Sequence, residues 1–218
     1  MNTINQFYID ELAASGGLKC GILDSMDVPD FNNRGSRYHG SNIPPFLSFD
    51  SHAVWIDVQT PETNLNPGFK NDGELDAIET VLKVLKKTSE FKEYIEAQKK
   101  PEDKEIGIIT FYSGQKREIR DRQKQKKFGN FCDYRIDVVD RFQGMERNIV
   151  IVSTVRSNLQ GNIGFAREIE RINVAFSRAK SLLIVIGNKT LFERNDDYKK
   201  SIAKMETINV KQLKDILR

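Results

Sequence analysis

Arg171 and Arg178 are cations whose charge could meet either an acidic side chain or a phosphate. Arg178 ends a segment with helical spacing and precedes an apolar run that begins at Leu182. A cation so close to buried structure needs a partner of opposite charge. On spacing alone, that partner is an acidic side chain in an ordinary helix salt bridge. Arg171, near the start of the same segment, has two open alternatives, which are an acidic partner and a phosphate.

Gln143 and Glu146 flank a glycine turn that follows another apolar run. Gly144 has no Cβ and lets the backbone approach a ligand closely. Two interpretations are open for this segment, namely a ligand-binding loop and a polar turn in which Glu146 is only a cap. Asp140 either orients this loop or is a plain turn residue.

Hydroxyl and aromatic side chains follow a third apolar run, at Thr110, Tyr112 and Ser113. Hydroxyls and backbone N–H groups contact phosphates in many complexes, and a tyrosine ring can stack on a base. A tyrosine buried at the end of a strand is the alternative. Gln115 then begins a basic segment, in which residues 116–127 hold seven basic and two acidic side chains, a surplus of 7 − 2 = +5. This segment either contacts a polyanion or forms a solvated helix face.

The chain lacks the phosphate loop of a nucleotide hydrolase. Gly35 and Gly40 have the separation of the G-x-x-x-x-G-K-[ST] motif, but Ser41 and Asn42 follow where Lys and Ser/Thr are required. No apolar strand ends in an Asp–Glu pair that would hold magnesium. We therefore expect no metal site, and no complete catalytic centre, in these residues.

Composition places the chain among globular proteins. It has 218 residues, a net charge of +3, 39% hydrophobic and 30% charged residues, which excludes global disorder. No apolar run approaches the ~18 residues of a membrane-spanning helix, and the first residues lack the pattern of a secretory signal. Cys20 and Cys132 form no disulfide framework. We expect an intracellular protein, cytoplasmic if bacterial, with no membrane partner.

Short β-branched runs alternate with segments of helical spacing. Strands are predicted over residues 53–58, 106–110, 136–139, 148–153 and 182–186, and helices over 72–85, 113–127 and 167–179. This alternation predicts an α/β fold with a parallel sheet that helices cover on both faces. Asn71 or Asp72 is the expected N-cap of the first of these helices. We expect three parts, namely an irregular connector at 1–52 with a short helix near 3–14, the α/β domain at 53–195 and a helical tail at 196–218.

Three segments in order resemble the second RecA-like domain of superfamily 1 helicases, in the branch of the nonsense-mediated-decay helicase and senataxin. These segments are residues 106–115, 139–146 and 171–180, and Ile163-Gly164-Phe165 and Gly187-Asn188 match the same branch. The resemblance covers about residues 50–195. It implies a RecA-like fold of the P-loop NTPase type that has no P-loop of its own.

The resemblance also implies roles for single residues. Arg178 corresponds to an arginine finger, which reaches across a cleft and stabilises charge on the transferred phosphoryl group. Glu146 accepts a hydrogen bond from the ribose of the nucleotide, and Gln143 couples the nucleotide and nucleic-acid sites. Gly144 and Arg171 complete this nucleotide-binding set, in which Asn173 braces the loop.

Residues 110–115 lie on the nucleic-acid path by the same resemblance. The expected contacts are Thr110, Tyr112, Ser113 and Gln115. Two positions depart from the family pattern. Val138 stands where the family usually has a Ser or Thr that meets a phosphate, and Lys180 stands where it often has Arg.

The resemblance predicts the C-terminal motor domain of an ATP-dependent DNA or RNA helicase. Residues 1–7 resemble the segment that follows a Gln-Tyr-Arg-Met motif at the start of such domains. ATP and Mg²⁺ are then expected to bind mainly to an upstream RecA-like domain of the same polypeptide, so the isolated chain is expected to be inactive. Single-stranded DNA or RNA is the expected partner. The alternative is a stand-alone nucleic-acid-binding or interaction module on a RecA-like scaffold without motor activity.

Overall fold

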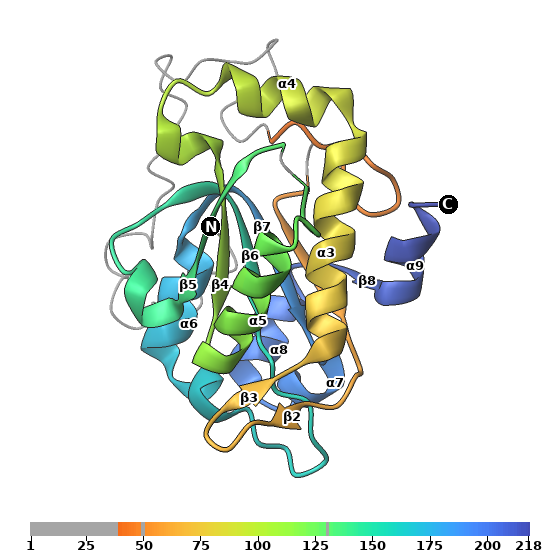
Figure 1. Ribbon diagram of the computed structural model, residues 1–218. Coiled ribbons are helices and arrows are strands. Elements are labelled where there is room, and N and C mark those ends of the chain that lie inside the picture. The colour runs from red at the N-terminus through yellow and green to blue at the C-terminus, as the bar shows by residue number, and fades with distance from the viewer. Residues whose placement is uncertain (1–38, 49–50, 130) are drawn as a thin grey trace, which may run out of the picture.

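Six strands form one parallel sheet in the computed structural model, which describes residues 39–48, 51–129 and 131–218 (Figure 1). In spatial order they are β5 (Asp133–Val138), β4 (Glu105–Thr110), β6 (Arg147–Ser153), β7 (Ala179–Gly187), β1 (Ala53–Asp57) and β8 (Glu206–Asn209). Every neighbouring pair is parallel. All carboxyl ends of the strands therefore lie at one edge of the sheet and all amino ends at the other.

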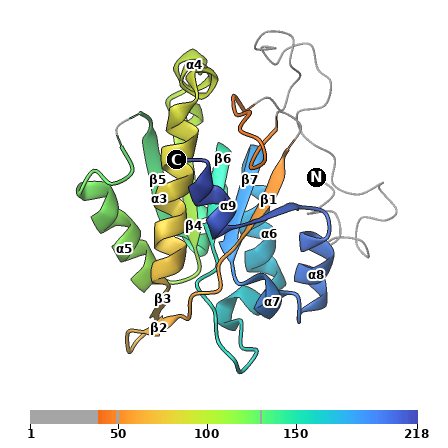
Figure 2. The same cartoon turned by 90° about the vertical axis from the view of Figure 1, so that its right-hand side faces the viewer.

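Helices cover both faces of this sheet, which confirms the predicted α/β class. Figure 2 shows α3 (Asp72–Lys87), α5 (Ser113–Lys124) and α9 (Val210–Asp215) on one face. The other face carries α6 (Ile169–Ser177), α7 (Lys189–Phe192) and α8 (Asp196–Ile202). Helix α4 (Ser89–Ala97) follows α3 beyond the amino edge.

Alternation along the strands divides the core into two clusters. Ile108, Ile151 and Ile184 are register partners on neighbouring strands and all face α3 and α5. The residues between them, such as Val150 and Val185, face α6 and α8. Parallel strands that are buried on both faces read as continuous apolar runs, which is why β4, β6 and β7 were predictable from sequence.

The ends of the elements differ from the predicted ones by a few residues. β5 begins at Asp133, before the predicted start at 136. Its first residues are polar and lie at an edge of the sheet, so they gave no apolar signal in the sequence. Helix α5 ends at Lys124, and Lys126 adopts a left-handed backbone with φ of 57°. Asn71, and not Asp72, caps α3, since its side chain accepts a hydrogen bond from the backbone N–H of Glu74.

The segment after residue 195 is not only helical. Between α8 and α9 it contains β8, which pairs with β1 and buries Ile208. One apolar residue among polar ones gave no strand signal, so only the pairing with β1 defines this edge strand. A second unpredicted feature is the antiparallel hairpin of β2 (Thr63–Asn64) and β3 (Phe69–Lys70).

The predicted connector is described only in part. Phe46 and Leu47 are buried in the core cluster on the α3 face, so the described end of this segment packs on the domain. The predicted helix at 3–14, Gly35 and Cys20 lie outside the described residues. The boundaries of the three parts stay a prediction. Across the described residues, no helix has both the length and the apolarity to cross a membrane.

Candidate functional site

The predicted site residues fall into two groups at opposite edges of the sheet. Residues 143–146 precede β6 and Arg178 precedes β7, so both lie at the amino edge. β6 and β7 are neighbours, and the backbone N–H of Arg147 donates to the Arg178 carbonyl at 2.9 Å. Residues 110–115 follow β4 and lie at the carboxyl edge. The Gln143–Glu146 loop and Arg178 are therefore separated from residues 110–115 by the length of the strands. Arg171, the remaining predicted nucleotide contact, lies at the start of α6 near the second group, because its guanidinium is 4.9 Å from the Phe165 ring, which packs on Tyr112.

Arg178 is the C-cap of α6 and is half-buried. Its Nε donates to the Val174 carbonyl at 3.0 Å, and its Nη2 donates to the Ser177 hydroxyl at 2.6 Å. Among the described residues it has no carboxylate partner. The helix salt bridge that spacing alone favoured is therefore not formed there.

Other arginines of comparable burial behave differently. Each has a carboxylate partner: Arg122 pairs with Asp76, Arg147 with Glu105, Arg156 with Glu62, and Arg171 with Asp140. Within the described ranges, Arg178 is the one partly buried arginine without an ion pair. Its hydrogen-bond partners are neutral groups at the carboxyl end of its own helix, where a positive charge is favoured.

The loop next to Arg178 is open to solvent. Gln143, Gly144 and Glu146 are exposed. Gly144 has φ of 78°, and a Cβ placed on it would meet no atom within 4 Å. The side chains of Gln143 and Glu146 form no hydrogen bond with any residue that the structure describes. Two hydrogen-bonding groups and an accessible backbone thus lie in the loop that precedes Arg147, whose backbone is bonded to that of Arg178.

Arg171 meets acidic partners rather than empty space. Its Nε and Nη2 contact the two carboxylate oxygens of Asp140 at 3.0 and 3.3 Å, and its Nη1 contacts Glu168 at 3.1 Å. The structure therefore agrees with the acidic-partner alternative. Lys180, at the position that departs from the family pattern, pairs with Asp103 at 2.7 Å. Unlike Arg178, both cations form ion pairs with described residues.

Asn173 is buried, and its side-chain oxygen accepts no hydrogen bond from a described residue. The predicted bracing contact to the neighbouring loop is therefore not made through this oxygen.

At the carboxyl edge, three of the four predicted nucleic-acid contacts are buried. Tyr112 is 4% exposed, and its ring packs against Phe69 and Phe165 with centroid distances of 5.5 Å each. Its hydroxyl accepts a hydrogen bond from Arg156 Nη1 at 3.2 Å. The ring consequently offers no face to a base, because the β2–β3 hairpin, which gave no signal in the sequence, covers it.

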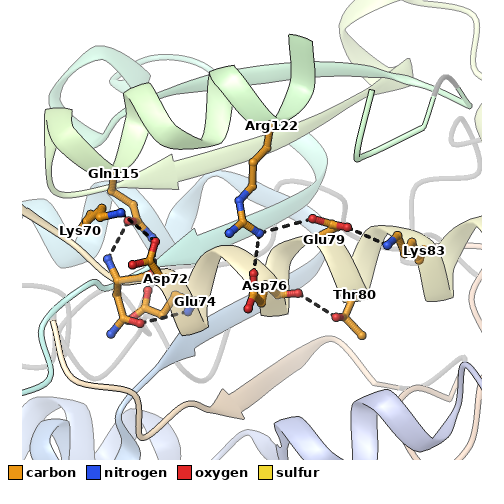
Figure 3. Close-up of polar contacts among 10 residues, drawn as sticks. Lys70, Asp72, Glu74, Asp76, Glu79, Thr80, Lys83, Gln115 and Arg122 are labelled. Carbon is orange, nitrogen blue, oxygen red and sulfur yellow. Dashed lines mark hydrogen bonds and ion pairs between the residues drawn. The ribbon is translucent and has the colours of Figure 1, made fainter. Parts of the chain in front are cut away.

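Thr110 and Gln115 are completely buried, and only Ser113 is exposed. Gln115 points from α5 toward the start of α3 (Figure 3). Its Oε1 accepts from the Asn71 N–H at 2.9 Å, and its Nε2 donates to Ser153 at 3.0 Å. Gln115 is thus positioned to hold α5 against α3. Of the four predicted nucleic-acid contacts, only Ser113 has an exposed side chain that can contact a strand of DNA or RNA directly.

A buried carboxyl group, Glu74, lies in the same network and was missed in the sequence. It comes four residues before Ile78 and seven before Val81, so helical spacing places it on the apolar face of α3. That position was the available signal. Ser153 donates to it at 2.6 Å, the Thr154 hydroxyl at 3.2 Å and the Val155 N–H at 2.8 Å. Complete burial raises the pKa of Glu74 to about 8, against the opposing effect of these hydrogen bonds.

The basic segment on α5 is largely neutralised by other elements. Arg122 contacts Asp76 and Glu79 of α3, as Figure 3 shows, and Lys116 and Arg120 share Asp137 of β5. Three of its cations form no ion pair within the described ranges, namely Arg117, Lys126 and Lys127. The structure therefore favours a solvated helix face for most of this segment.

The carboxyl edge also lacks a phosphate cradle. Gly68 and Gly73 have the separation of the phosphate-loop glycines, but Glu74 follows where lysine is required. The first turn of α3 is acidic, through Asp72 and Glu74. Glu74 is completely buried and Asp72 pairs with Lys70, so among the described residues this turn offers a phosphate no unpaired cation. Within the described ranges, the amino edge is the one that presents a partly buried arginine without an ion pair, Arg178.

Comparisons with known proteins identify relatives of the chain. A family model described as an AAA domain matches residues 4–190. The chain is 36% identical over 142 residues to putative helicase mov-10-B.1 of Danio rerio, which covers 60% of the chain and 14% of that protein. It is 35% identical over 147 residues to the probable helicase senataxin of Homo sapiens, with 66% and 5% covered. Helicase sen1 of Schizosaccharomyces pombe is 42% identical over 93 residues, with 42% and 6% covered.

The matched region is a small part of each relative. The chain corresponds to 14%, 5% and 6% of the lengths of these three proteins. The named relatives are therefore much longer proteins in which this region is one portion.

Burial of Glu74 predicts a pH dependence of stability. Its pKa is raised from 4.5 to about 8 in the folded state, so between these values the folded protein binds a proton that the unfolded protein has released. Stability should then fall as pH rises through this window, by about 1 kcal/mol per pH unit. Glu74→Gln has no such proton. We expect the free energy of unfolding in urea, measured from pH 5 to 8, to fall more steeply for the wild type than for this variant.

Other groups titrate in both proteins, so the difference between their curves isolates Glu74. Parallel curves for wild type and Glu74→Gln would show that this carboxyl group does not titrate in the window.

Proposed function

Since the chain belongs to the AAA-domain family of superfamily 1 helicases, in the branch of senataxin and MOV-10, we propose that it is the second motor domain of an ATP-dependent helicase. In this proposal ATP and Mg²⁺ bind mainly to an upstream RecA-like domain of the same polypeptide. The present domain supplies one wall of the nucleotide cleft and part of the path for a single strand of DNA or RNA.

The observation that carries the proposal is the unpaired guanidinium of Arg178 at the amino edge. Burying part of a cation without a carboxylate costs free energy unless a partner arrives. A phosphoryl group held by another domain is such a partner, and a planar guanidinium with several donors suits it better than an ammonium group. Arg178 bonds only to Val174 and Ser177, which are neutral, so it can leave these contacts without exposing a buried carboxylate.

Residues beside Arg178 supply the remaining contacts in this proposal. Bound ATP supplies the phosphoryl group, and its Mg²⁺ neutralises part of the phosphate charge. Glu146 is placed to accept a hydrogen bond from a ribose hydroxyl, and Gln143 to report the presence of the nucleotide to the rest of the loop. Gly144 leaves the backbone accessible to the ligand. Arg178 then stabilises the charge that develops on the phosphoryl oxygens.

The single strand is proposed to run along the carboxyl edge. Ser113 offers a hydroxyl and the first turn of α5 offers backbone N–H groups, both of which suit phosphate contacts. Such contacts hold the backbone of a strand without reading its sequence. They fit a motor that moves along nucleic acid of any sequence.

The alternative function is a stand-alone binding module without motor activity. The observation in its favour is the set of unpaired basic residues on and after α5, namely Arg117, Lys126 and Lys127. A module of this kind would bind through these cations with a strong dependence on salt. It would need neither Arg178 nor an upstream domain.

Arg178→Ala in the complete helicase should lower kcat for ATP hydrolysis by about 10³-fold or more, since arginine fingers contribute on this scale. The dissociation constant for ATP should change by less than about threefold, because the finger acts on the transition state. Single-turnover phosphate release and nucleotide titration measure the two effects. Arg167→Ala, at an exposed arginine of the same face, is the control and should leave both unchanged. Equal losses in binding and turnover would contradict the finger role.

The 218-residue chain alone should show no ATP hydrolysis above the buffer background. It has no G-x-x-x-x-G-K-[ST] motif, so nothing in it neutralises the terminal phosphates. Phosphate release at micromolar protein, with and without an oligonucleotide, is the measurement. Turnover near about 1 s⁻¹, which is ordinary for an enzyme, would contradict a catalytic centre divided between two domains.

Charge reversal at Lys124, Lys126 and Lys127 separates the motor from the module. Lys124 already pairs with Asp121 at 3.2 Å, whereas Lys126 and Lys127 are two of the three cations of this segment without an ion pair among the described residues. In the motor proposal we expect oligonucleotide affinity to fall by less than about tenfold and ATP hydrolysis at saturating strand to persist. Fluorescence anisotropy at several salt concentrations measures the affinity. Complete loss of binding, with normal binding in Ser113→Ala, would instead support the module.

A further inference from the structure

All the described hydrogen bonds to the side chain of Glu74 come from the end of β6 and the residues that follow it. The Val155 N–H lies 2.8 and 2.9 Å from its two oxygens, and the hydroxyls of Ser153 and Thr154 donate to the same carboxyl group. It forms no ion pair with any described residue. A completely buried carboxyl group without a cation is costly to maintain. The role of this carboxyl group, which lies between α3 and the end of β6, therefore needs an explanation.

Val155 adopts a backbone that a β-branched residue rarely tolerates, with φ of 72°. Both of its backbone polar groups are bound by the start of α3. Its N–H donates to Glu74, and its carbonyl accepts from Asn71 Nδ2 at 3.2 Å. A strained conformation of this kind persists only where the surroundings over-determine it. Asn71 and Glu74 are those surroundings.

The turn at Val155 sets the direction of the loop that follows β6. Arg156 then reaches Glu62 and the Tyr112 hydroxyl, and the Ser157 N–H donates to Glu62 at 2.6 Å. These contacts tie the loop after β6 to the loop after β4. Both loops lie at the carboxyl edge.

Gln115 extends the same network to α5. It donates to the Ser153 hydroxyl, which in turn donates to Glu74, and it bonds both backbone groups of Asn71. Figure 3 shows Gln115 reaching from α5 to the start of α3, beside Glu74. One carboxyl group thus lies at the junction of α3, the end of β6 and the first turn of α5.

We propose that Glu74 is a positioning residue that holds the loop after β6 and the first turn of α5 as one unit. Within the proposed motor, which this inference assumes, that unit forms the nucleic-acid-facing edge, and Glu74 sets its affinity for a strand without touching the strand. The loop after β6 bonds to Glu74 directly, and the first turn of α5 reaches the same carboxyl group through Gln115 and Ser153.

Hydrogen exchange tests the link in the 218-residue chain itself. In Glu74→Ala, amides in residues 111–116 and in residues 154–157 should both exchange at least about tenfold faster. Glu74→Gln keeps the size and one acceptor oxygen, and should show the same change in both segments to a smaller extent. Glu79→Gln, on the same helix in an ion pair with Arg122, is the matched control and should change neither. Where Glu74→Ala fails to fold, Glu74→Gln decides. Acceleration of one segment alone, or of neither, overturns the link.

Strand-stimulated ATP hydrolysis in the complete helicase tests the functional part. In Glu74→Ala the oligonucleotide concentration for half-maximal stimulation should rise at least about fivefold, while KM for ATP and kcat at saturating strand stay within about twofold. Glu74→Gln should recover most of the affinity. An unchanged activation curve, together with faster exchange, overturns the role in strand binding. If the wild type shows no strand-stimulated hydrolysis, the motor proposal fails, and the exchange result alone decides the link.

Discussion

Arg178 keeps a half-buried positive charge that the described domain does not neutralise. The other arginines of similar burial each meet a carboxylate, so the domain has the means to pair such charges and does so elsewhere. At Arg178 the carbonyl end of α6 and the Ser177 hydroxyl take the place of an acid. Neutral acceptors at a helix carboxyl end tolerate the charge without cancelling it. The guanidinium therefore remains available to a ligand with negative charge.

The sheet relates this charge to the rest of the proposed site. β6 carries the open Gln143–Glu146 loop before its first residue and the Val155 turn after its last. Its residues are buried on both faces, and packed interiors resist continuous deformation. β6 is thus a rigid connection between the two edges of the sheet. An arrangement of this kind suits a protein in which nucleotide and nucleic acid bind at different edges.

The features that could be predicted from the sequence are those that a local pattern of residues determines. The strands β1, β4, β6 and β7 are apolar runs buried on both faces, and their order along the chain was enough for an α/β parallel sheet. The open loop around Gly144 and the placement of Arg178 before β7 also followed from short motifs. β8 and the β2–β3 hairpin were not predictable, because two to four mostly polar residues become strands only through pairing with a partner. The hairpin in turn buries Tyr112, so a segment that gave no signal in the sequence decides between the two alternatives for that residue.

Glu74 and the basic helix both show that local sequence does not determine which charges are paired in the folded protein. Residues 116–127 carry a surplus of +5 when only their own acids are counted, but Asp76, Glu79 and Asp137 contact them from α3 and β5, and 5 − 3 leaves +2. Glu74 shows the opposite case. A count of charges includes it as an ordinary acidic residue of α3, but in the structure it is buried and forms no ion pair with a described residue. Local sequence counts charges, whereas binding depends on which charges remain unpaired after folding. By that criterion the basic helix is a weaker candidate for polyanion contact than its composition indicates, and Arg178, a single charge in an unremarkable segment, is a stronger one.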